Sequence, residues 1–488
     1  MSFKKISHSL LLLSVGSLLA IILILNFVYP LTLGKTNILY SDFGKFYHSQ
    51  QMFIQGKNIY TPIYFVKNKL NTSSHTKPAK PTHSKVLKLG GNLNPPFFTL
   101  ISFPLAYLSY PHALFLWTLL SLLAGALGIL LIQQKLNPQT FSASYTVLLL
   151  IALFSYFPTF ATLPFGQVSL FLLPLLALGW RAARDEKTIR AAIFLGIATS
   201  LKPFIGLFLF YFLMRKEWRG LCAFFATLLS CALIAAWFLG LDSYADYYQA
   251  CQQIKWAASS WNVSIYGFLL RLFGGIESNM AVLPIPGLIT YVYPLLAGVF
   301  FLTIIRFLRP SVNMLAEQKV DLDFSVIILG MLLLSPLGWI YYFPLLSIPI
   351  LILWQFAKKG IYPIALPIIL MACIFLSNIP ISLFDSDQIN TANMLRIFFG
   401  SSLYFLVLIS LTSLIFWLPY RLAADFELYS RQSAKRIHFE SIAPSLLLLI
   451  GIVVFLPSYQ GISKVTADWI LHSAHYSKQY LYLAHHRD

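Results

Sequence analysis

The chain has 488 residues, of which 58% are hydrophobic and only 11% are charged, and its formal net charge is +18. Soluble domains carry roughly 25% charged residues, so this composition excludes a large soluble enzyme and predicts an integral membrane protein. Nucleic acid is excluded as a partner because no segment resembles a soluble domain that could bind it. The basic balance is typical of cytoplasmic loops and of contact with anionic membrane lipids. The four cysteines form no CxxC pair and are expected to be unpaired.

Residues 9–29 carry no charge over a length that suits a crossing of the ~30 Å hydrocarbon core. The stretch is too long for the apolar region of a signal peptide, and it is followed by no clear cleavage site. We therefore expect residues 1–30 to form an uncleaved first transmembrane anchor.

Asp42 is the only carboxylate among the first 184 residues and follows this anchor closely. Ser41 is a good N-cap, and the sequence DFGKFYHSQQMFIQ has helical spacing that ends at Gly56. Asp42 would then lie in the first turn of a short interfacial helix, where the helix dipole favours a negative charge. Such a carboxylate can act as a general base; the alternative interpretation is an aspartate that only stabilises the helix.

Basic residues between the later apolar segments predict the topology. The apolar segments lie near 111–132, 142–157, 165–181, 219–240, 287–308, 323–338, 341–357, 361–379, 397–419 and 442–457. Short basic loops follow at 181–190, 215–219, 306–319, 357–360 and 420–436. The positive-inside rule places these loops and the N-terminus in the cytoplasm.

This topology requires two further features. Residues 94–109 cannot cross the membrane, and Pro95 and Pro96 would begin a helix at the outer face. Residues 189–214 must cross and return, with a break at Lys202-Pro203.

The predicted fold is an all-α polytopic membrane protein with about 13 transmembrane helices and interfacial helices in the first outer loop. The predicted parts are the anchor (1–30), an extracytoplasmic loop (31–110), a transmembrane core (111–357), additional transmembrane helices (358–457) and an extracytoplasmic tail (458–488). The predicted location is the cell (inner) membrane. The side that carries Asp42 would face away from the cytoplasm.

Several polar residues are predicted to reach this same outer side. Lys202 would be a cation within an apolar helical pair, which indicates an anionic ligand unless the side chain extends to the membrane interface. Gln167 precedes a span and could donate to a ligand hydroxyl or cap a helix. Residues 259–275 predict a short helix with Asn262 and Arg271, which suit hydroxyl and phosphate groups or belong to a plain interfacial helix. Trp339 and Tyr341 follow a Pro-Gly break and suit either a sugar face or an aromatic belt.

The order of these motifs resembles glycosyltransferase family 87, polytopic enzymes of the GT-C superfamily. The resembling stretches are SDFGKFYHSQQMFIQGKNIY, NPPFFTLISFPLAYLSYPHALFLW, FGQVSLFLLPLLALGW, IATSLKPFIGLFLFYFLMRKEWR, SWNVSIYGFLLRLF and LLLSPLGWIYYFPLL, and they cover about residues 8–357. The chain departs from the family where many members have a histidine after the Ser-Pro-x-x-Trp turn: here Ile340 and Tyr341 follow. Residues 380–488 are not interpreted by the resemblance.

The resemblance implies an inverting transfer of a hexose, with mannose favoured, from a polyprenyl-phosphate-linked donor to a hydroxyl of a lipid or glycan acceptor. It implies Asp42 as catalytic base and matches Lys202, Gln167 and Asn262 to family motifs. The leaving group is a phosphate, which cations stabilise. The candidates are Lys202 and Arg271, assisted by His48 or by lysines of the first loop. The expected substrate-binding residues are Lys202, Gln167, Asn262, Arg271, Tyr341, Trp339, Asn94 and His48. No cofactor and no metal site is expected. The alternatives are a lipid-linked sugar flippase or transporter, and a surface-glycan ligase or polymerase.

Overall fold

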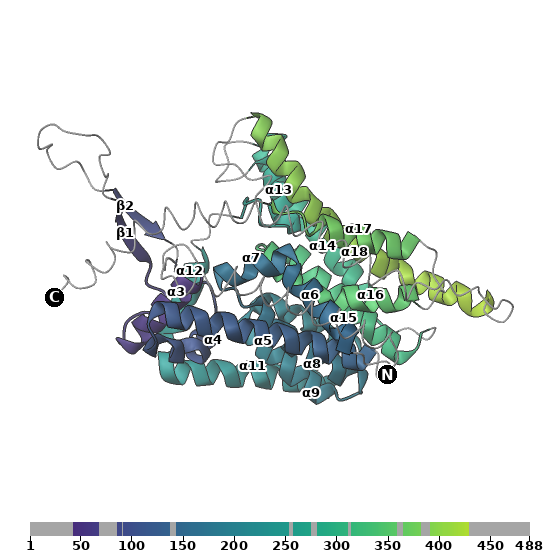
Figure 1. Cartoon of the computed structure of the whole chain (residues 1–488), viewed down its shortest axis with the longest axis horizontal. Coiled ribbons are helices and arrows are strands. Elements are labelled where there is room, and N and C mark those ends of the chain that lie inside the picture. Colours follow the sequence, from purple (N-terminus) through teal and green to yellow (C-terminus); the bar gives the residue numbers. More distant parts are fainter. Residues whose placement is uncertain are drawn as a thin grey trace, which may run out of the picture.

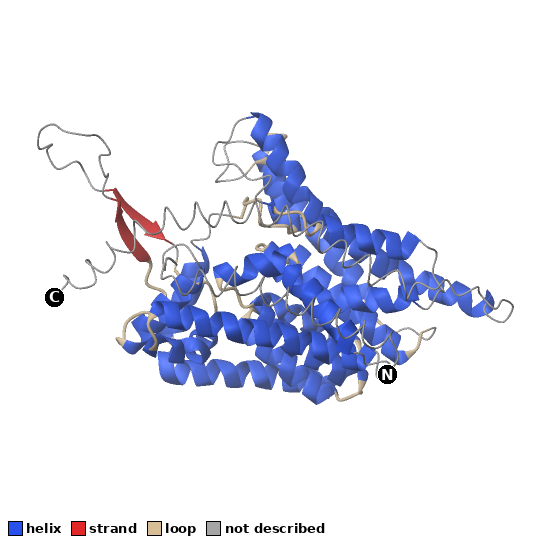
Figure 2. Cartoon of the chain, viewed as in Figure 1, coloured by secondary structure: helices blue, strands red, loops and turns tan. Residues whose placement is uncertain are grey.

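The structure is a computed structural model, and it describes residues 42–67, 85–89, 91–136, 143–252, 257–274, 281–310, 314–358, 365–381 and 391–428. The predicted anchor (1–30), the N-cap Ser41, the predicted span at 442–457 and the tail (458–488) lie outside the described residues. The described part is predominantly helical, and one antiparallel hairpin, β1 (Ile63–Lys67) paired with β2 (Lys85–Leu89), extends away from the helices (Figure 2).

Four long helices pack side by side along the length of the molecule (Figure 1). They are α5 (Tyr110–Leu136), α8 (Ser169–Arg184), α9 (Thr188–Leu201) and α11 (Trp218–Leu239). Glycines allow their close approach: a Cβ at Gly128 would lie 2.6 Å from Leu173, and one at Gly179 would lie 2.9 Å from Leu195. Small residues at such crossings are typical of helices that pack within membranes.

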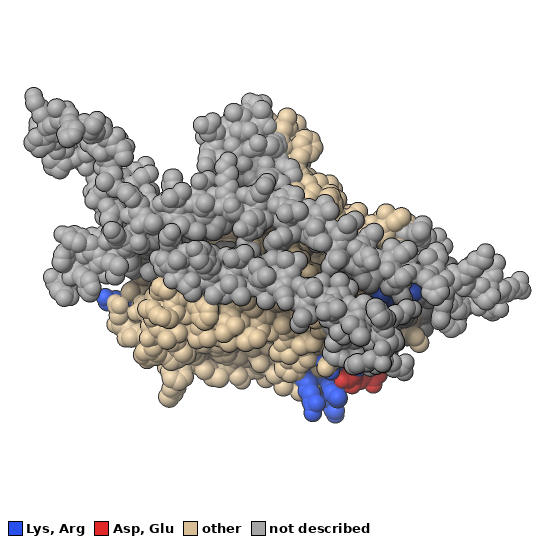
Figure 3. Space-filling view, in the orientation of Figure 1, with Lys and Arg blue, Asp and Glu red and all other residues tan. Residues whose placement is uncertain are grey.

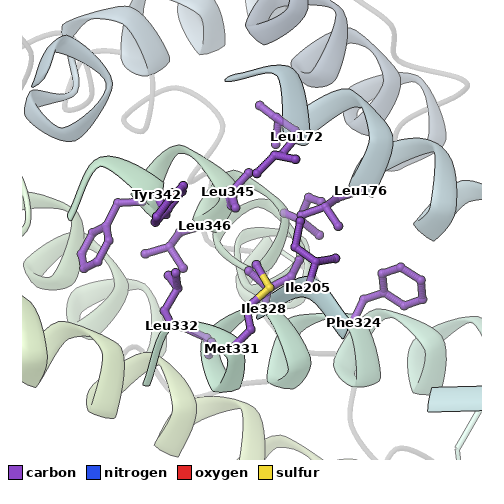
Figure 4. Close-up of a cluster of buried hydrophobic side chains, with 14 of the residues drawn as sticks. Leu172, Leu176, Ile205, Phe324, Ile328, Met331, Leu332, Tyr342, Leu345 and Leu346 are labelled. Atoms are coloured by element: carbon purple, nitrogen blue, oxygen red, sulfur yellow. The ribbon is translucent and has the colours of Figure 1, made fainter. Parts of the chain in front are cut away.

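A second group of helices packs against this bundle around α15 (Ala316–Leu334). Its other members are α13 (Ile265–Phe273), η4 (Pro286–Leu288), α14 (Ile289–Phe307), η5 (Ile340–Leu346), α16 (Ser347–Lys358), α17 (Ala365–Leu376) and α18 (Thr391–Leu428). Side chains of α8, α15 and η5 interlock with Ile205 in a buried apolar cluster (Figure 4). Because Met331 and Tyr342 of this cluster also line the cavity described below, the core directly supports its wall.

Short helices close one end of the bundle. These are α3 (Asp42–Ile54), α4 (Pro96–Ser102), η2 (Phe103–Tyr107) and α12 (Asp242–Gln252). The helix predicted after Asp42 is confirmed, and Gly56 follows it with a φ of 65°. The segment predicted not to cross the membrane forms only the short helices α4 and η2, with Pro96 at the start.

Five described helices are long and apolar enough to cross a membrane, or six if a bent pair counts as one span. The chain is therefore a helical membrane protein, whereas the predicted total of about 13 spans stays a prediction. The break at Lys202-Pro203 is confirmed: α9 ends at Leu201, and η3 (Pro203–Phe208) and α10 (Leu209–Met214) follow. Lys202 itself is extended (φ −144°, ψ 106°), because the residue before a proline is disfavoured in the helical region.

One local expectation was wrong. The sequence FPTFATLPFGQVS (157–169) indicates a proline-rich outer turn, but residues Phe157–Phe165 form a helix, α7, bent by 66° from the end of α6 (Ala143–Ser155). Pro158 lies in the first turn of α7, where its missing N–H has no helical partner to lose. The turn comes later, at Gly166, and this difference decides where Gln167 lies.

A network of charged side chains lies at the end of the bundle away from α3. Figure 3 shows other, exposed Lys, Arg, Asp and Glu side chains at this end. Asp323 is fully buried and pairs with Lys319 and with Arg215 at 3.0 Å. Asp321 accepts from the Trp180 indole at 2.8 Å and pairs with Arg184 at 3.3 Å. The network joins α8 and α15 to Arg215, the residue after α10, beside the basic turns at 185–188 and 215–218.

Candidate active site

A cavity of about 540 Å³ lies where α3, α12 and the Lys202 break meet the turn after α15. Its lining includes Asp42, Lys45, Phe46, Asn94, Gln167, Lys202, Tyr247, Cys251, Trp339, Tyr341 and Tyr342. Six of the nine residues predicted for the site are in this set, although they come from five separate stretches of sequence. The cavity is polar at its catalytic candidates and apolar along most of its remaining wall, a combination typical of ligand sites.

Aromatic packing fixes the position of Asp42. The following residue, Phe43, is fully buried, and its ring lies 5.6 Å from that of Trp117 on α5. Phe46, one turn later, contacts Phe98 of α4 edge-on at 4.9 Å. Two buried rings therefore hold α3 against the bundle, while Asp42 remains 23% exposed at the cavity.

Asp42 contacts two polar side chains. Lys45 donates to Asp42 Oδ1 at 2.8 Å from the next turn of α3, and the amide nitrogen of Gln167 donates to Oδ2. The second contact depends on Gly166, which has a φ of 64° and whose added Cβ would lie 2.4 Å from Phe43 Cβ. The Trp117 indole donates to the Gly166 carbonyl at 2.8 Å and fixes the turn. A glycine at this position thus allows the close approach that joins Gln167 to Asp42.

Lys202 lies at the broken helix and faces the same cavity. Its ammonium nitrogen is 5.7 Å from the centre of the Tyr342 ring, within cation–π range. Among the described residues no carboxylate forms a salt bridge with Lys202 within 4.0 Å. Asp42 and Lys202 therefore supply a carboxylate and an ammonium group to one enclosed volume, without neutralising each other by direct contact.

An aromatic wall follows the break after α15. Trp339 and Tyr341 stack with ring centres 5.7 Å apart and planes 23° from parallel. Phe165 of α7 lies beyond Tyr341 at 6.2 Å. Such a wall can pack against the apolar C–H face of a sugar ring.

Asn262 and Arg271 do not line the cavity. The Asn262 amide donates to the carbonyls of Ala257 and Pro336, each at 2.8 Å, and Arg271 donates to the carbonyls of Ser259 and Asn262, each at 2.7 Å. These bonds hold the segment before α13 against the turn that carries Trp339. Both residues support the wall from behind, and of the two only Arg271 lies within α13.

His48 and Asn94 differ in their positions. His48 lies on α3 but does not line the cavity, and burial lowers the pKa of its imidazole. Asn94 does line the cavity and is fully buried. Lys45, a cation of the first loop, lines the cavity, whereas His48 does not.

Tyr247 and Cys251 of α12 are cavity residues that the sequence interpretation did not single out. Their i, i+4 spacing places them on one helix face, but nothing in the composition of 242–252 distinguishes that face. Tyr247 also contacts Tyr60 at 5.8 Å, and burial raises the pKa of both phenols, so neither is a source of negative charge. No group of three potential metal ligands occurs among the described residues.

Comparison with known families gives one match. The model of glycosyltransferase family 87 matches residues 92–347, just over half of the chain. The match includes Asn94, Gln167, Lys202, Trp339 and Tyr341, while Asp42 precedes it. No curated protein and no solved structure matches the chain at a significant level.

Proposed function

The chain belongs to glycosyltransferase family 87, and from this membership we propose that it is an inverting hexosyltransferase with a polyprenyl-phosphate-linked donor. The favoured sugar is mannose, and the acceptor is a hydroxyl of a lipid or glycan. The observation that carries the proposal is the placement of Asp42 and Lys202 in one cavity at the end of an apolar helical bundle. A lipid-linked donor would keep its chain in the membrane and present its phosphate and sugar to that cavity.

The chemistry needs one base and one cationic group. The acceptor hydroxyl attacks the anomeric carbon and forms the new glycosidic bond, while its proton passes to the Asp42 carboxylate. The bond between the anomeric carbon and the phosphate oxygen breaks, and the electron pair leaves with the polyprenyl phosphate. Lys202, with Lys45 nearby, stabilises the added charge on the phosphate. A single carboxylate is sufficient because inversion in one step forms no covalent enzyme intermediate.

The basic turns indicate the side of the membrane on which the cavity opens. The basic turns at 185–188 and 215–218 lie at the end of the bundle away from α3, and the positive-inside rule assigns them to the cytoplasm. The cavity would then open on the extracytoplasmic side of the cell membrane. Anionic lipids would contact the basic end.

The experiment is to incubate the purified full-length protein in lipid nanodiscs with radiolabelled polyprenyl-phosphate hexoses and membrane lipid extract. We expect label from one donor to move to a new product. The proposal would be overturned if no donor transferred its hexose and no donor bound to the protein. In sealed proteoliposomes, movement of an intact donor across the bilayer without product would indicate a transporter.

A further inference from the structure

Two buried amide oxygens belong to residues that line the cavity and have no hydrogen-bond donor among the described residues. They are Oε1 of Gln167, whose residue is 4% exposed, and Oδ1 of Asn94, whose residue is fully buried. Buried polar atoms in folded proteins are nearly always paired. Because both residues line one cavity, a ligand in that cavity is the source of donors that we consider.

The orientation of the Gln167 amide is fixed by its neighbour. Its nitrogen donates to Asp42, which is ion-paired with Lys45 at 2.8 Å. An ion-paired carboxylate accepts hydrogen bonds and does not donate them. The amide nitrogen must therefore face Asp42, so Oε1 is the atom left for a ligand.

The Asn94 amide is fixed through Asn92. The backbone N–H of Asn94 can only donate, and it does so to Asn92 Oδ1 at 3.0 Å. Asn94 Nδ2 donates to the same oxygen at 2.9 Å, so Asn94 Oδ1 points elsewhere. Asn92 Nδ2 donates to Thr99 Oγ1 at 3.0 Å, and the Tyr60 hydroxyl donates to the Asn94 carbonyl at 2.7 Å. This network holds the acceptor in place before any ligand arrives.

We propose that Asn94 Oδ1 and Gln167 Oε1 accept hydrogen bonds from two hydroxyl groups of a saccharide and thereby determine which sugar the enzyme uses. The inference rests on the proposed function and deepens it. It assigns Gln167 the role of acceptor toward the ligand, whereas the sequence alone suggested a donor. Because Gln167 also donates a hydrogen bond to Asp42, the sugar hydroxyl that it binds would lie beside the proposed base.

The chemistry of the site determines which sugars fit. A free hydroxyl donates to an amide oxygen, but a deoxy position or an O-acylated position cannot. A site built to bind a hydroxyl discriminates strongly against the analogue that lacks it, because its own polar group is then left unpaired. The two hydroxyls belong either to the donor hexose or to a saccharide acceptor, and the test has an arm for each.

The donor arm measures binding of farnesyl-phosphate mannose and its monodeoxy forms to the full-length protein in nanodiscs. The acceptor arm measures kcat/KM for octyl mannoside and its monodeoxy forms, with the intact donor. In one arm, removal of a particular hydroxyl should weaken binding or kcat/KM about tenfold or more. In Asn94→Ala, removal of the hydroxyl that Asn94 binds should cause no further loss. In Gln167→Ala, the same should hold for the hydroxyl that Gln167 binds.

Gln50→Ala is the matched control. Gln50 is also fully buried, donates to Ser102 Oγ at 2.9 Å and has an unpaired Oε1, but it does not line the cavity. The deoxy losses should remain unchanged in this variant. Each loss is a ratio within one variant, so a general weakening from imperfect folding cancels.

The inference would be overturned if removal of no single hydroxyl weakened binding or kcat/KM in the wild type. It would also be overturned if the losses were the same in the wild type and in both variants. The absence of any such loss in the wild type would reject the inference even if a variant failed to accumulate. Absence of these losses together with normal hexosyl transfer would leave the proposed function intact, whereas absence of both transfer and donor binding would reject the proposed function itself.

Discussion

The position and contacts of Asp42 fit the general base that we propose. Its carboxylate is oriented by Gln167 and Lys45 and remains partly open to the cavity. A purely helix-stabilising aspartate would need neither contact. The general-base and helix-stabilising interpretations make opposite predictions for asparagine, a neutral side chain of the same shape.

Asp42→Asn should reduce hexosyl transfer by about 10²–10⁴-fold, because it removes the basic oxygen that takes the acceptor proton. Donor binding should remain, since the phosphate contacts are elsewhere. The measurement is product formation by the purified variant, with its thermal stability as the control. Turnover within a few-fold of the wild type would reject the base assignment.

Lys202→Met should weaken donor binding about tenfold or more while the amount of folded protein changes little. The reason is that a cation at a helix break persists where it has an anionic partner, and no described residue forms a salt bridge with it. Binding of farnesyl-phosphate mannose is the measurement. Lys216→Met, on a turn at the far end of the bundle, is the matched control. Reduced accumulation with normal donor affinity would show that Lys202 has a structural role.

At the scale of elements, the site depends on how closely α3 approaches the turn between α7 and α8. Gly166 has a left-handed backbone and no room for a Cβ beside Phe43. The geometry of Asp42 and Gln167 is therefore set by a residue that has no functional group. The bend between α6 and α7 brings that turn to α3.

Gly166→Ala should lower transfer about tenfold or more, because the added methyl group forces α3 away and strains a positive φ. The measurement is kcat/KM for the donor together with the melting temperature. Gly298→Ala, on α14 with open space around its Cα, is the control and should leave both values unchanged. Normal turnover in Gly166→Ala would show that the contact between Asp42 and Gln167 is dispensable.

At the scale of the whole molecule, the buried charges and the cavity lie at different ends. Asp323 of α15 is fully buried between Lys319 of the same helix and Arg215, which follows α10. It joins the two helix groups far from the reacting residues. We therefore expect stability and chemistry to respond separately to mutation.

Asp323→Ala should destabilise the protein by about 3–5 kcal/mol, because it leaves buried cations without their partner. Thermal unfolding in detergent measures this loss. The control variant is Glu317→Ala, whose carboxylate is exposed and should contribute little. Folded molecules of Asp323→Ala should retain their kcat; loss of kcat at unchanged stability would contradict the separation of the two ends.

The topology can be tested on the same scale. In a variant without native cysteines, Ser109→Cys should react with a membrane-impermeant thiol reagent from outside the cell, because residue 109 is exposed beside η2. Lys187→Cys should react only after the membrane is opened. Reaction of Ser109→Cys from the cytoplasmic side alone would invert the proposed orientation.

The sequence by itself determined the class of the protein, the family and most helices. Long uncharged stretches can lie only in a membrane core, and their alternation with basic loops is a local signal. The helix that begins at Asp42 and the break at Lys202-Pro203 were also predictable, because a capping serine, an aspartate in the first turn, a terminal glycine and a proline act on their immediate neighbours. The isolated carboxylate and the lysine in an apolar stretch stood out for the same reason.

Only the tertiary structure decided which of these residues meet. Asn262 and Arg271 have side chains that suit a substrate, yet their hydrogen bonds go to carbonyls behind the cavity wall. Tyr247 and Cys251 looked ordinary in sequence but line the cavity because α12 packs over it. The amide of Gln167 is oriented by Asp42, which is distant in sequence, whereas that of Asn94 is oriented by Asn92, two residues before it. Hydrogen-bond direction and helix packing are properties of the assembled molecule, and no local pattern of residues encodes them.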